Sequence, residues 1–251
     1  MHIYKIFLIL PIFKTNSFSQ NIIFNQSNFL SRSSETRSLV EALNSSIKFE
    51  KVINITMPKV STFLSHSIID EIKTHLNIEK IDLIVVDCSL SPIQHRNLEK
   101  ILEVKVIDRT QLIIEIFGLR ATSSEGKIQV ELANLNFQKT RLVRSWTHLE
   151  RQRGGLSKVG GPGESQLELD KRIIDTKIVN IKKQLLKVKK TRNIQRKRRT
   201  DISLPIFSLV GYTNSGKSTI FNKLTSSRVL VKDMVFATLD TKMSLVNLPN
   251  Q

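Results

Sequence analysis

A glycine-rich stretch near the end of the 251-residue chain has the spacing of a phosphate-binding loop. Residues 211–218 read GYTNSGKS and fit the pattern G-x-x-x-x-G-K-[ST]. Backbone N–H groups of such a loop converge on phosphate oxygens, an approach that a side chain at Gly216 would block. The amino group of Lys217 can bridge the terminal phosphates, and the hydroxyl of Ser218 can bind Mg²⁺. The residues predicted to bind the nucleotide here are Gly211, Tyr212, Thr213, Asn214, Ser215, Gly216, Lys217 and Ser218.

The residues on either side of the loop predict the strand and the helix that such a loop connects. Residues 205–210 (PIFSLV) form an apolar run typical of a buried strand. Residues 218–225 (STIFNKLT) continue as a helix, with Ile220, Phe221 and Leu224 expected to face inward. A helix that begins at the loop adds partial positive charge to the phosphate site. The loop alone does not distinguish GTP from ATP.

Two long helices with the rhythm of a coiled coil precede the loop and predict an antiparallel hairpin over residues 121–200. In each helix the apolar residues recur every three or four positions, and one seam position holds a lysine. Residues 151–165 (RQRGGLSKVGGPGES) let the chain reverse, so that each seam can cover the other. The two seams are Ile128, Leu132, Leu135, Lys139, Leu142, Trp146 and Leu149, and Leu167, Lys171, Ile174, Ile178, Ile181, Leu185 and Val188.

The charge of the chain favours a polyanionic partner. Its net charge is +17, and residues 182–199 are rich in Lys and Arg without one acidic residue. Few aromatic residues lie there, which favours contact with RNA phosphates over base stacking. The alternatives are a solvated helix face and, for the glycine-rich tip, a flexible connector. The candidates for RNA contact are Arg151, Arg153, Lys158, Arg196, Lys197, Arg198 and Arg199.

The first half of the chain predicts a small α/β domain over residues 35–120. Residues 81–87 and 104–108 are short apolar runs that predict buried strands, and a helix that Ser91 caps is expected between them. Strand, helix and strand in this order are typical of a βαβ unit. The single cysteine, Cys88, excludes an internal disulfide and is expected to be a core residue rather than a nucleophile.

Residues 1–34 have the composition of a targeting or disordered segment. A basic residue, Lys5, precedes the apolar residues 6–13, and no acidic residue occurs before Glu35. This composition predicts delivery to a plastid or a similar organelle; the alternatives are a cytoplasmic protein and a genome with biased base composition. No apolar run reaches the ~20 residues that a membrane-spanning helix needs. We therefore expect no membrane span, and we expect a monomer.

Seven blocks of sequence, taken in order, resemble the HflX family of ribosome-associated GTPases. They read LSPIQHRNLEK, VIDRTQLIIEIF, EGKIQVELANL, RLVRSWTHLERQRGG, GGPGESQLELDKR, VGYTNSGKST and FATLD. The resemblance covers roughly residues 81–248 and implies an α/β fold: a small N-terminal α/β domain, an antiparallel coiled-coil-like hairpin and the start of a P-loop GTPase domain at 201–251. It further implies that the protein binds GTP and the large ribosomal subunit, through ribosomal RNA, and can separate ribosomal subunits.

The family's nucleotide and metal contacts carry over to particular positions of this chain. Those of the FATLD block map onto Phe236, Ala237, Thr238, Leu239 and Asp240. Those for Mg²⁺ map onto Ser218 and Thr238, the latter in the triphosphate state. Asn214 stands where related GTPases can hold a potassium ion, which we state as a hypothesis. No catalytic residue is assigned.

Two departures from the family pattern limit these expectations. Residues 62–67 (TFLSHS) lack the glycines and lysines of the family's usual loop, which puts any contact by that loop in doubt. The sequence also ends before the D-x-x-G and N-K-x-D elements, so we expect residues 1–251 alone to bind GTP weakly and not to hydrolyse it. The alternative is a truncated, non-hydrolysing basic module that docks on ribosomal RNA; a P-loop ATPase unrelated to ribosomes is a third interpretation.

Overall fold

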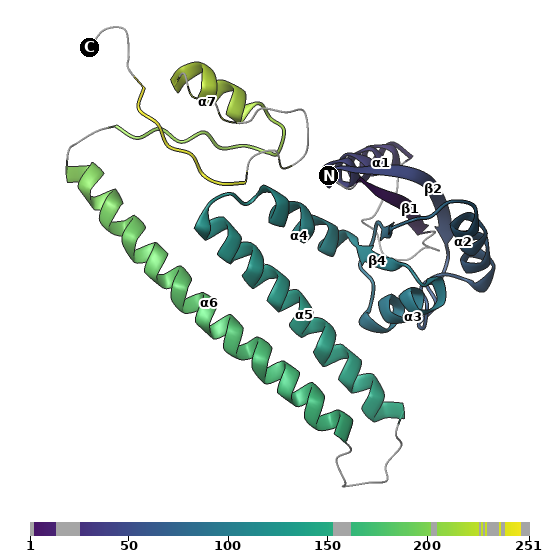
Figure 1. Cartoon of the computed structure of the whole chain (residues 1–251). Coiled ribbons are helices and arrows are strands. Elements are labelled where there is room, and N and C mark those ends of the chain that lie inside the picture. The colour runs from purple at the N-terminus through teal and green to yellow at the C-terminus, as the bar shows by residue number, and fades with distance from the viewer. Residues whose placement is uncertain are drawn as a thin grey trace, which may run out of the picture. The chain divides into compact units, whose positions relative to one another are not determined.

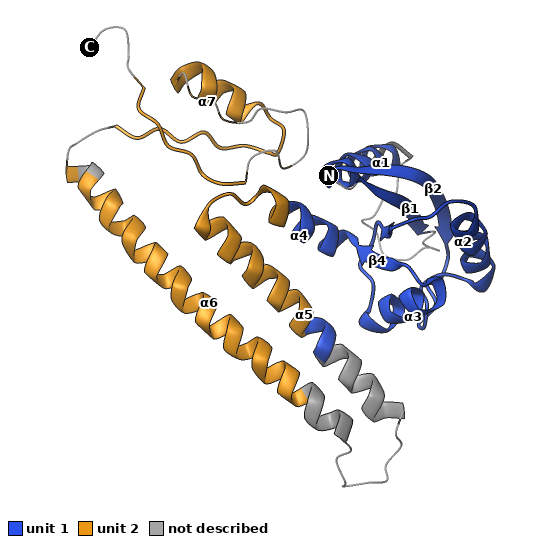
Figure 2. Cartoon of the chain, viewed as in Figure 1, with its two compact units in different colours: residues 1–116, 140–160 blue, residues 117–139, 161–251 orange. Residues whose placement is uncertain are grey.

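A computed structural model describes residues 3–13, 26–152, 162–201, 205–225, 227, 229, 236 and 239–246. Within these ranges, the side chains of residues 26–28, 143–152, 162–167, 199 and 200 are not described. The chain divides into two units (Figure 2). The first comprises Met1–Ile116 and Thr140–Gly160, and the second comprises Phe117–Lys139 and Gly161–Gln251.

The first unit is built on a four-stranded parallel sheet in the order β2-β1-β3-β4 (Figure 1). The strands are β1 (Tyr4–Phe13), β2 (Ser45–Ile55), β3 (Leu83–Val86) and β4 (Lys105–Asp108). The helices that alternate with them are α1 (Gln26–Glu41), α2 (His66–Ile78), α3 (Pro92–Leu102) and α4 (Arg109–Arg120), of which the last crosses into the second unit. The βαβ interpretation of the sequence is thus confirmed, with β3 and β4 lying inside the two predicted runs.

Strand β1 is central to this sheet, which corrects the sequence interpretation of residues 1–34. Tyr4–Phe13 pairs with β2 along its whole length, and Ile6–Ile9 pairs with β3 on the other side. Ile6 to Leu10 are buried because a parallel sheet is covered on both faces, and such a strand has the same continuous apolar run as a leader segment. The disordered assignment is therefore wrong for residues 4–13 and for residues 26–34, the first part of α1. Residues 14–25 lie outside the described part of the chain.

Helix α3 begins as the sequence predicts. The Oγ atom of Ser91 accepts a hydrogen bond from the N–H of Gln94 at 3.3 Å, and the N–H of Ser91 donates to Oε1 of Gln94 at 2.9 Å. This reciprocal pair is a capping box, and Pro92 occupies the first turn, where no N–H is needed. The cap sets the direction in which α3 leaves the carboxyl end of β3.

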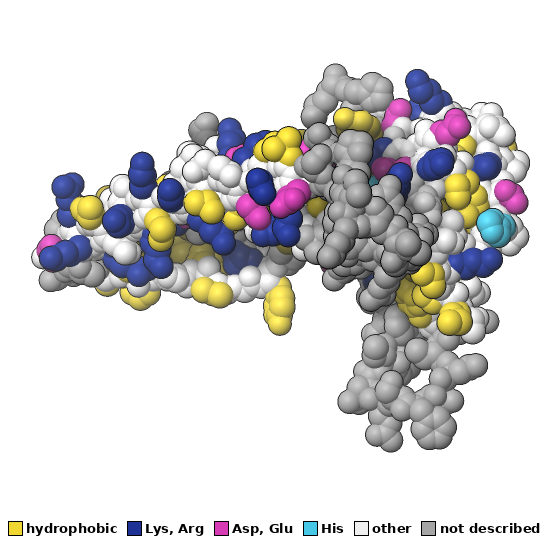
Figure 3. Space-filling view, turned by 90° about the horizontal axis from the view of Figure 1, so that it is seen from below, with side chains coloured by type: hydrophobic (Ala, Val, Ile, Leu, Met, Phe, Trp, Pro, Cys, Tyr) yellow, Lys and Arg dark blue, Asp and Glu magenta, His cyan; other side chains and the backbone are white. Residues whose placement is uncertain are grey.

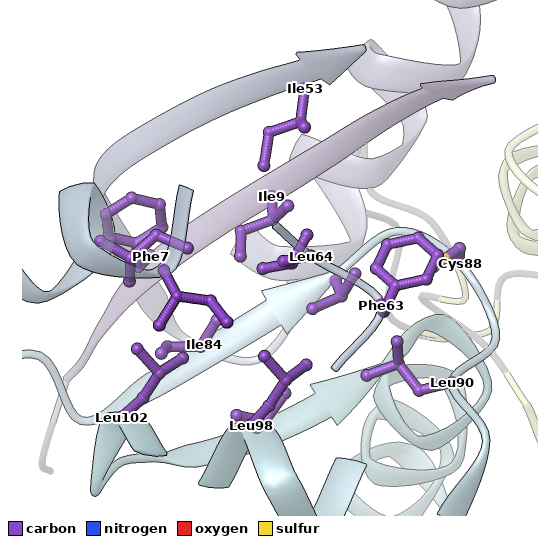
Figure 4. Packing of buried hydrophobic residues seen from close by; sticks show 14 of the residues in the cluster. Phe7, Ile9, Ile53, Phe63, Leu64, Ile84, Cys88, Leu90, Leu98 and Leu102 are labelled. Atoms are coloured by element: carbon purple, nitrogen blue, oxygen red, sulfur yellow. The ribbon is translucent and has the colours of Figure 1, made fainter. Parts of the chain in front are cut away.

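The core of the first unit includes the stretch that departs from the family pattern. Phe63 and Leu64 are buried against β1 and β3, and Phe63 has a positive φ of 64° (Figure 4). Cys88 is also buried in this cluster, as predicted. Burial, with a smaller contribution from Asp87, raises the pKa of the Cys88 thiol to about 12. A thiol so strongly protonated is a packing residue, because the thiolate is the reactive form.

A buried carboxylate, that of Asp87, lies at the carboxyl end of β3. Asp87 accepts hydrogen bonds from Nε of Arg32 at 2.8 Å and from Nη1 of Arg109 at 2.7 Å, while its own side chain is 4% exposed. Arg109 also donates to Oγ1 of Thr36 at 2.8 Å and pairs with Glu35 at 2.7 Å. These contacts tie α1 and α4 to the sheet edge, and they satisfy the charge of a carboxylate that would be costly to bury alone.

The second unit contains the hairpin of α5 (Ser124–Gln152) and α6 (Pro162–Asp201), apart from the part of α5 beyond Lys139 (Figures 1 and 2). Leu135, Ile178 and Ile181 form its buried seam, which confirms the predicted pairing of the two helices. The half-buried residues packed against them are Ile128, Leu132, Ile174 and Leu185. The lysine predicted in the first seam, Lys139, lies 2.5 Å from Oδ1 of Asp175.

The ends of the hairpin seam are less completely described. Trp146, Leu149 and Leu167 have side chains outside the described set, and residues 153–161 of the predicted tip lie outside it altogether. Among the described helices, none combines the length and the apolar character that crossing a membrane requires.

Candidate nucleotide site

The candidate loop turns tightly and leads directly into helix α7 (Lys217–Thr225). Two residues of the loop have positive φ, Asn214 at 58° and Gly216 at 77°. Glycine adopts such a conformation without strain, which gives Gly216 a reason beyond phosphate access. Apart from its chain neighbours, a Cβ at Gly216 would meet no atom of the described residues within 4 Å, so the described part of the chain leaves that side of the loop open.

Gly211 fulfils a different requirement from Gly216. A Cβ at Gly211 would approach Oγ of Ser215 to 3.0 Å, so the absence of a side chain lets the loop close on itself. The N–H of Ile220 then donates to the carbonyl oxygen of Gly216 at 3.0 Å, the first helical hydrogen bond of α7. In any α-helix the first N–H groups point out of the helix end, which makes the beginning of a helix a potential anion-binding site.

Lys217 lies over the loop rather than extending away from it. Its Nζ atom donates hydrogen bonds to the carbonyl oxygen of Tyr212 and to Oγ of Ser215, the latter at 3.3 Å. The ammonium group is therefore held beside the loop by exchangeable oxygen acceptors. Together with the amides at the start of α7 and the half-buried Ser218, it forms a donor set that suits a polyphosphate with a bound Mg²⁺.

The elements predicted around the loop are only partly present. Residues 205–210 form no strand, and Phe207 and Val210 are 89% and 90% exposed, so the buried-strand prediction is wrong for this structure. Helix α7 is confirmed, but Ile220 and Leu224 are exposed rather than inward-facing, and Phe221 is half-buried. The physical reason is that a strand is buried only by pairing and covering, and the described residues provide no strand beside 205–210.

The FATLD block lies against the junction between α4 and α5. Oδ2 of Asp240 accepts hydrogen bonds from the backbone N–H groups of Thr122 and Ser123, at 2.9 and 2.8 Å. The Oγ1 of Thr122 donates to Oδ2 at 2.6 Å, and Oγ of Ser123 donates to Oδ1 at 2.5 Å. The Ser123 hydroxyl and then the Thr122 hydroxyl hold the pKa of Asp240 below its usual range.

Phe236 also contacts this junction, through an edge-to-face contact with Phe117 at 4.8 Å between ring centroids. Leu239 is described, whereas Ala237 and Thr238 lie outside the described residues. Sequence reasoning did not find Phe117, Thr122 or Ser123. The serines and threonines before Glu125 could have predicted a helix cap, but nothing local points to a partner 117 residues away.

The candidates for RNA contact are described only on α6. Arg196, Lys197 and Arg198 are exposed there. The side chains of Arg151 and Arg199 are not described, and Arg153 and Lys158 lie outside the described residues. On the face that Figure 3 shows, Lys and Arg side chains are spread widely and acidic side chains are few. Among the described residues there is no cluster of three or more His, Cys, Asp or Glu that could hold a metal.

Family models match three consecutive parts of the chain. The GTP-binding GTPase N-terminal model matches residues 31–118, the GTP-binding GTPase Middle Region model matches 120–199, and the 50S ribosome-binding GTPase model matches 206–251. Among solved structures, a GTP-binding protein of Sulfolobus solfataricus in complex with GDP has a TM-score of 0.52 at 23% identity. The similarity covers 89% of this chain and 54% of that one, and at this identity it supports the fold alone. The class of protein is thus a P-loop GTPase with a preceding α/β domain and helical hairpin.

Curated relatives narrow this class to one family. The GTPase HflX of Magnetococcus marinus is 54% identical over 190 residues, which cover 76% of this chain and 44% of the relative. The GTPase HflX of Escherichia coli is 52% identical over 165 residues, 66% of this chain and 38% of the relative. The chain belongs to the HflX family of GTPases. It spans about half the length of the curated relatives that it matches.

Proposed function

We propose that this chain is the part of an HflX GTPase that grips the phosphates of GTP and carries the ribosome-binding hairpin. In this proposal, GTP binding and hydrolysis by the whole protein are coupled to binding of the large ribosomal subunit or to separation of the subunits. The observation that carries the proposal is the closed loop at 211–218, with Lys217 held over it and α7 beginning beneath it. The family membership supports GTP as the nucleotide.

The residues of the loop have distinct parts in the proposed site. The amides of residues 213–218 would donate to the β- and γ-phosphate oxygens, and Lys217 would exchange its contacts with Tyr212 and Ser215 for phosphate contacts. Ser218 and Thr238 would hold Mg²⁺, which supplies charge neutralisation when it is bound. A potassium ion beside Asn214 is part of the same proposal.

Nucleotide titrations of the full chain would test this proposal. We expect Lys217→Ala to weaken binding of a fluorescent GTP analogue by about 100-fold, the scale of a lost charge-assisted phosphate contact. Lys223→Ala is the matched control, because Lys223 is an exposed lysine on the same helix. Competition by unlabelled GTP is expected. Equal affinities of the two variants would contradict the proposal.

Each of the two metal ions has a test of its own, Mg²⁺ in the binding assay and K⁺ in a turnover assay. Removal of Mg²⁺ should weaken binding of GTP, because the ion neutralises phosphate charge. Turnover by the whole protein should fall when Na⁺ replaces K⁺. Turnover that does not respond to this exchange would exclude the potassium site while leaving the rest of the proposal intact.

Docking on ribosomal RNA is the second component of the proposal. The exposed basic residues of α6 support it, because a helix with so many like charges is stabilised when phosphates neutralise them. Co-sedimentation with large ribosomal subunits should weaken steeply as salt rises. Replacement of Arg196, Lys197 and Arg198 by Gln should weaken it further, with Lys73, Lys80 and Lys100 replaced by Gln as an equally charged control. Equal loss in both triple variants would indicate a non-specific charge effect.

The second candidate function is that of a module that docks on ribosomal RNA without hydrolysing GTP, in place of a GTPase whose nucleotide state controls docking. The exposed residues Arg196, Lys197 and Arg198 of α6 favour it, because their contacts with RNA phosphates would need no nucleotide. Ribosome co-sedimentation that is unchanged by Lys217→Ala and by added GTP would support this candidate over the first.

We further propose delivery to a plastid or a similar organelle. Because β1 is part of the sheet, it would then have to be retained after import. Organelle fractionation tests whether the protein is delivered there.

A further inference from the structure

The first and the last residue of the FATLD block, Phe236 and Asp240, both contact the junction between α4 and α5. On one side, Asp240 receives four hydrogen bonds from Thr122 and Ser123. On the other side, the ring of Phe236 meets the ring of Phe117 on α4 nearly at a right angle, 86° between planes. The two anchors are polar and apolar respectively, and they lie four positions apart in sequence. The contacts belong to a single unit of the molecule.

Gly126 makes room for the carboxylate of Asp240. A Cβ at this position would lie 2.4 Å from Oδ1 of Asp240, closer than any real side chain permits. The N–H of Gly126 donates to Oγ of Ser123 at 2.9 Å, so the same hydroxyl caps α5 and binds Asp240. A glycine in the first turn of a helix is otherwise unfavourable, because alanine is the better helix former. The close approach of Asp240 gives this glycine a physical reason.

The carboxylate has the electrostatic setting of a helix N-terminus. It lies where the partial positive charge of α5 is greatest, and two backbone N–H groups donate to it directly. Oδ2 accepts three of the four hydrogen bonds and Oδ1 accepts the fourth, a pattern that fixes the plane of the carboxylate. Such a contact holds a chain segment in one orientation, whereas a single surface contact would not.

We propose that Asp240 is a positioning residue, which seats the FATLD block on the α4–α5 junction and thereby couples nucleotide binding to the base of the hairpin. The proposal rests on the proposed function, since the block includes Thr238, the predicted Mg²⁺ contact of the triphosphate state. Because Phe236 and Asp240 are already held on the junction, GTP binding has less freedom to remove at these two residues, so GTP binds more tightly when both contacts are intact. By reciprocity, bound GTP stabilises the seat, and α5 begins at that seat.

Two glycine variants of the full chain provide a matched test. Gly126→Ala places a methyl group against Asp240 and leaves every hydrogen-bonding residue in place. Gly118→Ala adds the same methyl group to α4, where it would come only to 3.9 Å from Val130, an ordinary contact. We expect Gly126→Ala to weaken binding of GTP with Mg²⁺ about 5- to 10-fold and binding of GDP less than about 2-fold, from the reduced fraction of seated chains. Gly118→Ala should match the wild type for both nucleotides.

Amide hydrogen exchange gives a readout that does not depend on nucleotide hydrolysis. Without nucleotide, the peptide covering residues 239–246 and the N–H groups of Thr122 and Ser123 should exchange several-fold faster in Asp240→Asn and Gly126→Ala than in Gly118→Ala. Glu168→Gln, which neutralises an exposed carboxylate of α6, is the charge control for Asp240→Asn. Addition of GTP with Mg²⁺ to the wild type should slow exchange at Thr122 and Ser123.

The outcomes separate this inference from the proposed function. If the wild type does not bind GTP, the proposed function fails. If the wild type binds GTP while Gly126→Ala and Gly118→Ala behave alike, the positioning role of Asp240 is overturned and the proposed function stands. Tighter GTP binding in Gly126→Ala also overturns it, because the seat would then oppose binding. Circular dichroism of the glycine variants should show unchanged helix content, since alanine is favoured in helices.

Discussion

Two apolar runs of similar composition, residues 6–10 in β1 and 205–210 before the phosphate-binding loop, lie in opposite surroundings. Every residue of the first run is buried, whereas Phe207 in the second is 89% exposed. The first run has a parallel strand on each side, from residues 45–55 and 83–86. The second has no strand partner among the described residues. Apolar composition therefore marks a candidate strand, and pairing with distant segments decides whether it is buried.

The same contrast applies to charged groups in the two units. Asp87 is enclosed by Arg32 and Arg109, at the end of a strand whose neighbours are all in place. Lys217 bonds to oxygens of its own loop and is only half-buried. In the first case the charges are satisfied within the chain and serve stability. In the second, Lys217 can exchange its contacts with the loop oxygens for contacts with a ligand, which is what a binding site requires.

The thiol of Cys88 should give the largest difference between the two regions. With a pKa of about 12, only about one thiol in ten thousand is ionised at pH 8, against about a quarter of exposed thiols. We expect alkylation of Cys88 in the folded chain to be roughly a thousandfold slower than in urea. Ser215→Cys in a Cys88→Ala background should react rapidly, because that position is exposed beside Lys217. Equal rates at the two positions would contradict the burial described for Cys88.

Replacing one isoleucine in each run by alanine would test whether the buried run contributes more to the free energy of unfolding than the exposed run. Ile9→Ala should lower the free energy of unfolding by about 4 kcal/mol, because the side chain is fully buried in the central strand. Ile206→Ala should change it by less than about 1 kcal/mol, since Ile206 is half exposed. Urea denaturation followed by circular dichroism gives both values. A large loss from Ile206→Ala would show that residues 205–210 are paired in solution.

The buried ion pairs of Asp87 should contribute more than a surface pair of similar geometry. Asp87→Ala leaves Arg32 and Arg109 without their shared carboxylate and should cost about 3 kcal/mol of unfolding free energy. Glu50→Gln breaks the exposed pair with Arg37 and should cost less than about 1 kcal/mol. The same urea experiment compares them. Similar costs would mean that water screens the Asp87 cluster more than its burial indicates.

The hairpin offers the smallest effect and the sharpest control. Lys139→Ala removes a partly exposed pair with Asp175 and should cost about 0.5 kcal/mol. Leu135→Ala, one turn away in the same seam, should cost about 2 kcal/mol because it opens a cavity among buried side chains. Thermal unfolding followed by the helical circular dichroism signal at 222 nm would rank the two variants. A larger loss from Lys139→Ala would assign the pairing of α5 and α6 to charge rather than to apolar contact.

Much of the local structure could be predicted from the sequence because short-range physics specifies it. The seam residues of α5 and α6 follow from helical periodicity, and the cap of α3 follows from Ser91 and Gln94. The loop at 211–218 follows from glycine spacing, and the structure adds the positive φ of Gly216 as a reason for that glycine. The buried state of Cys88 could likewise be predicted from its apolar neighbours.

What the sequence determined by itself was therefore the set of elements, the loop and the sign of the charge, all of which depend on residues close together in the chain. Only the tertiary structure decided that residues 4–13 are a central strand, that residues 205–210 are exposed and that Asp240 binds the start of α5. Each of these depends on partners that are tens of residues away or more. Their energies come from hydrogen bonds and burial that no local pattern of residues encodes.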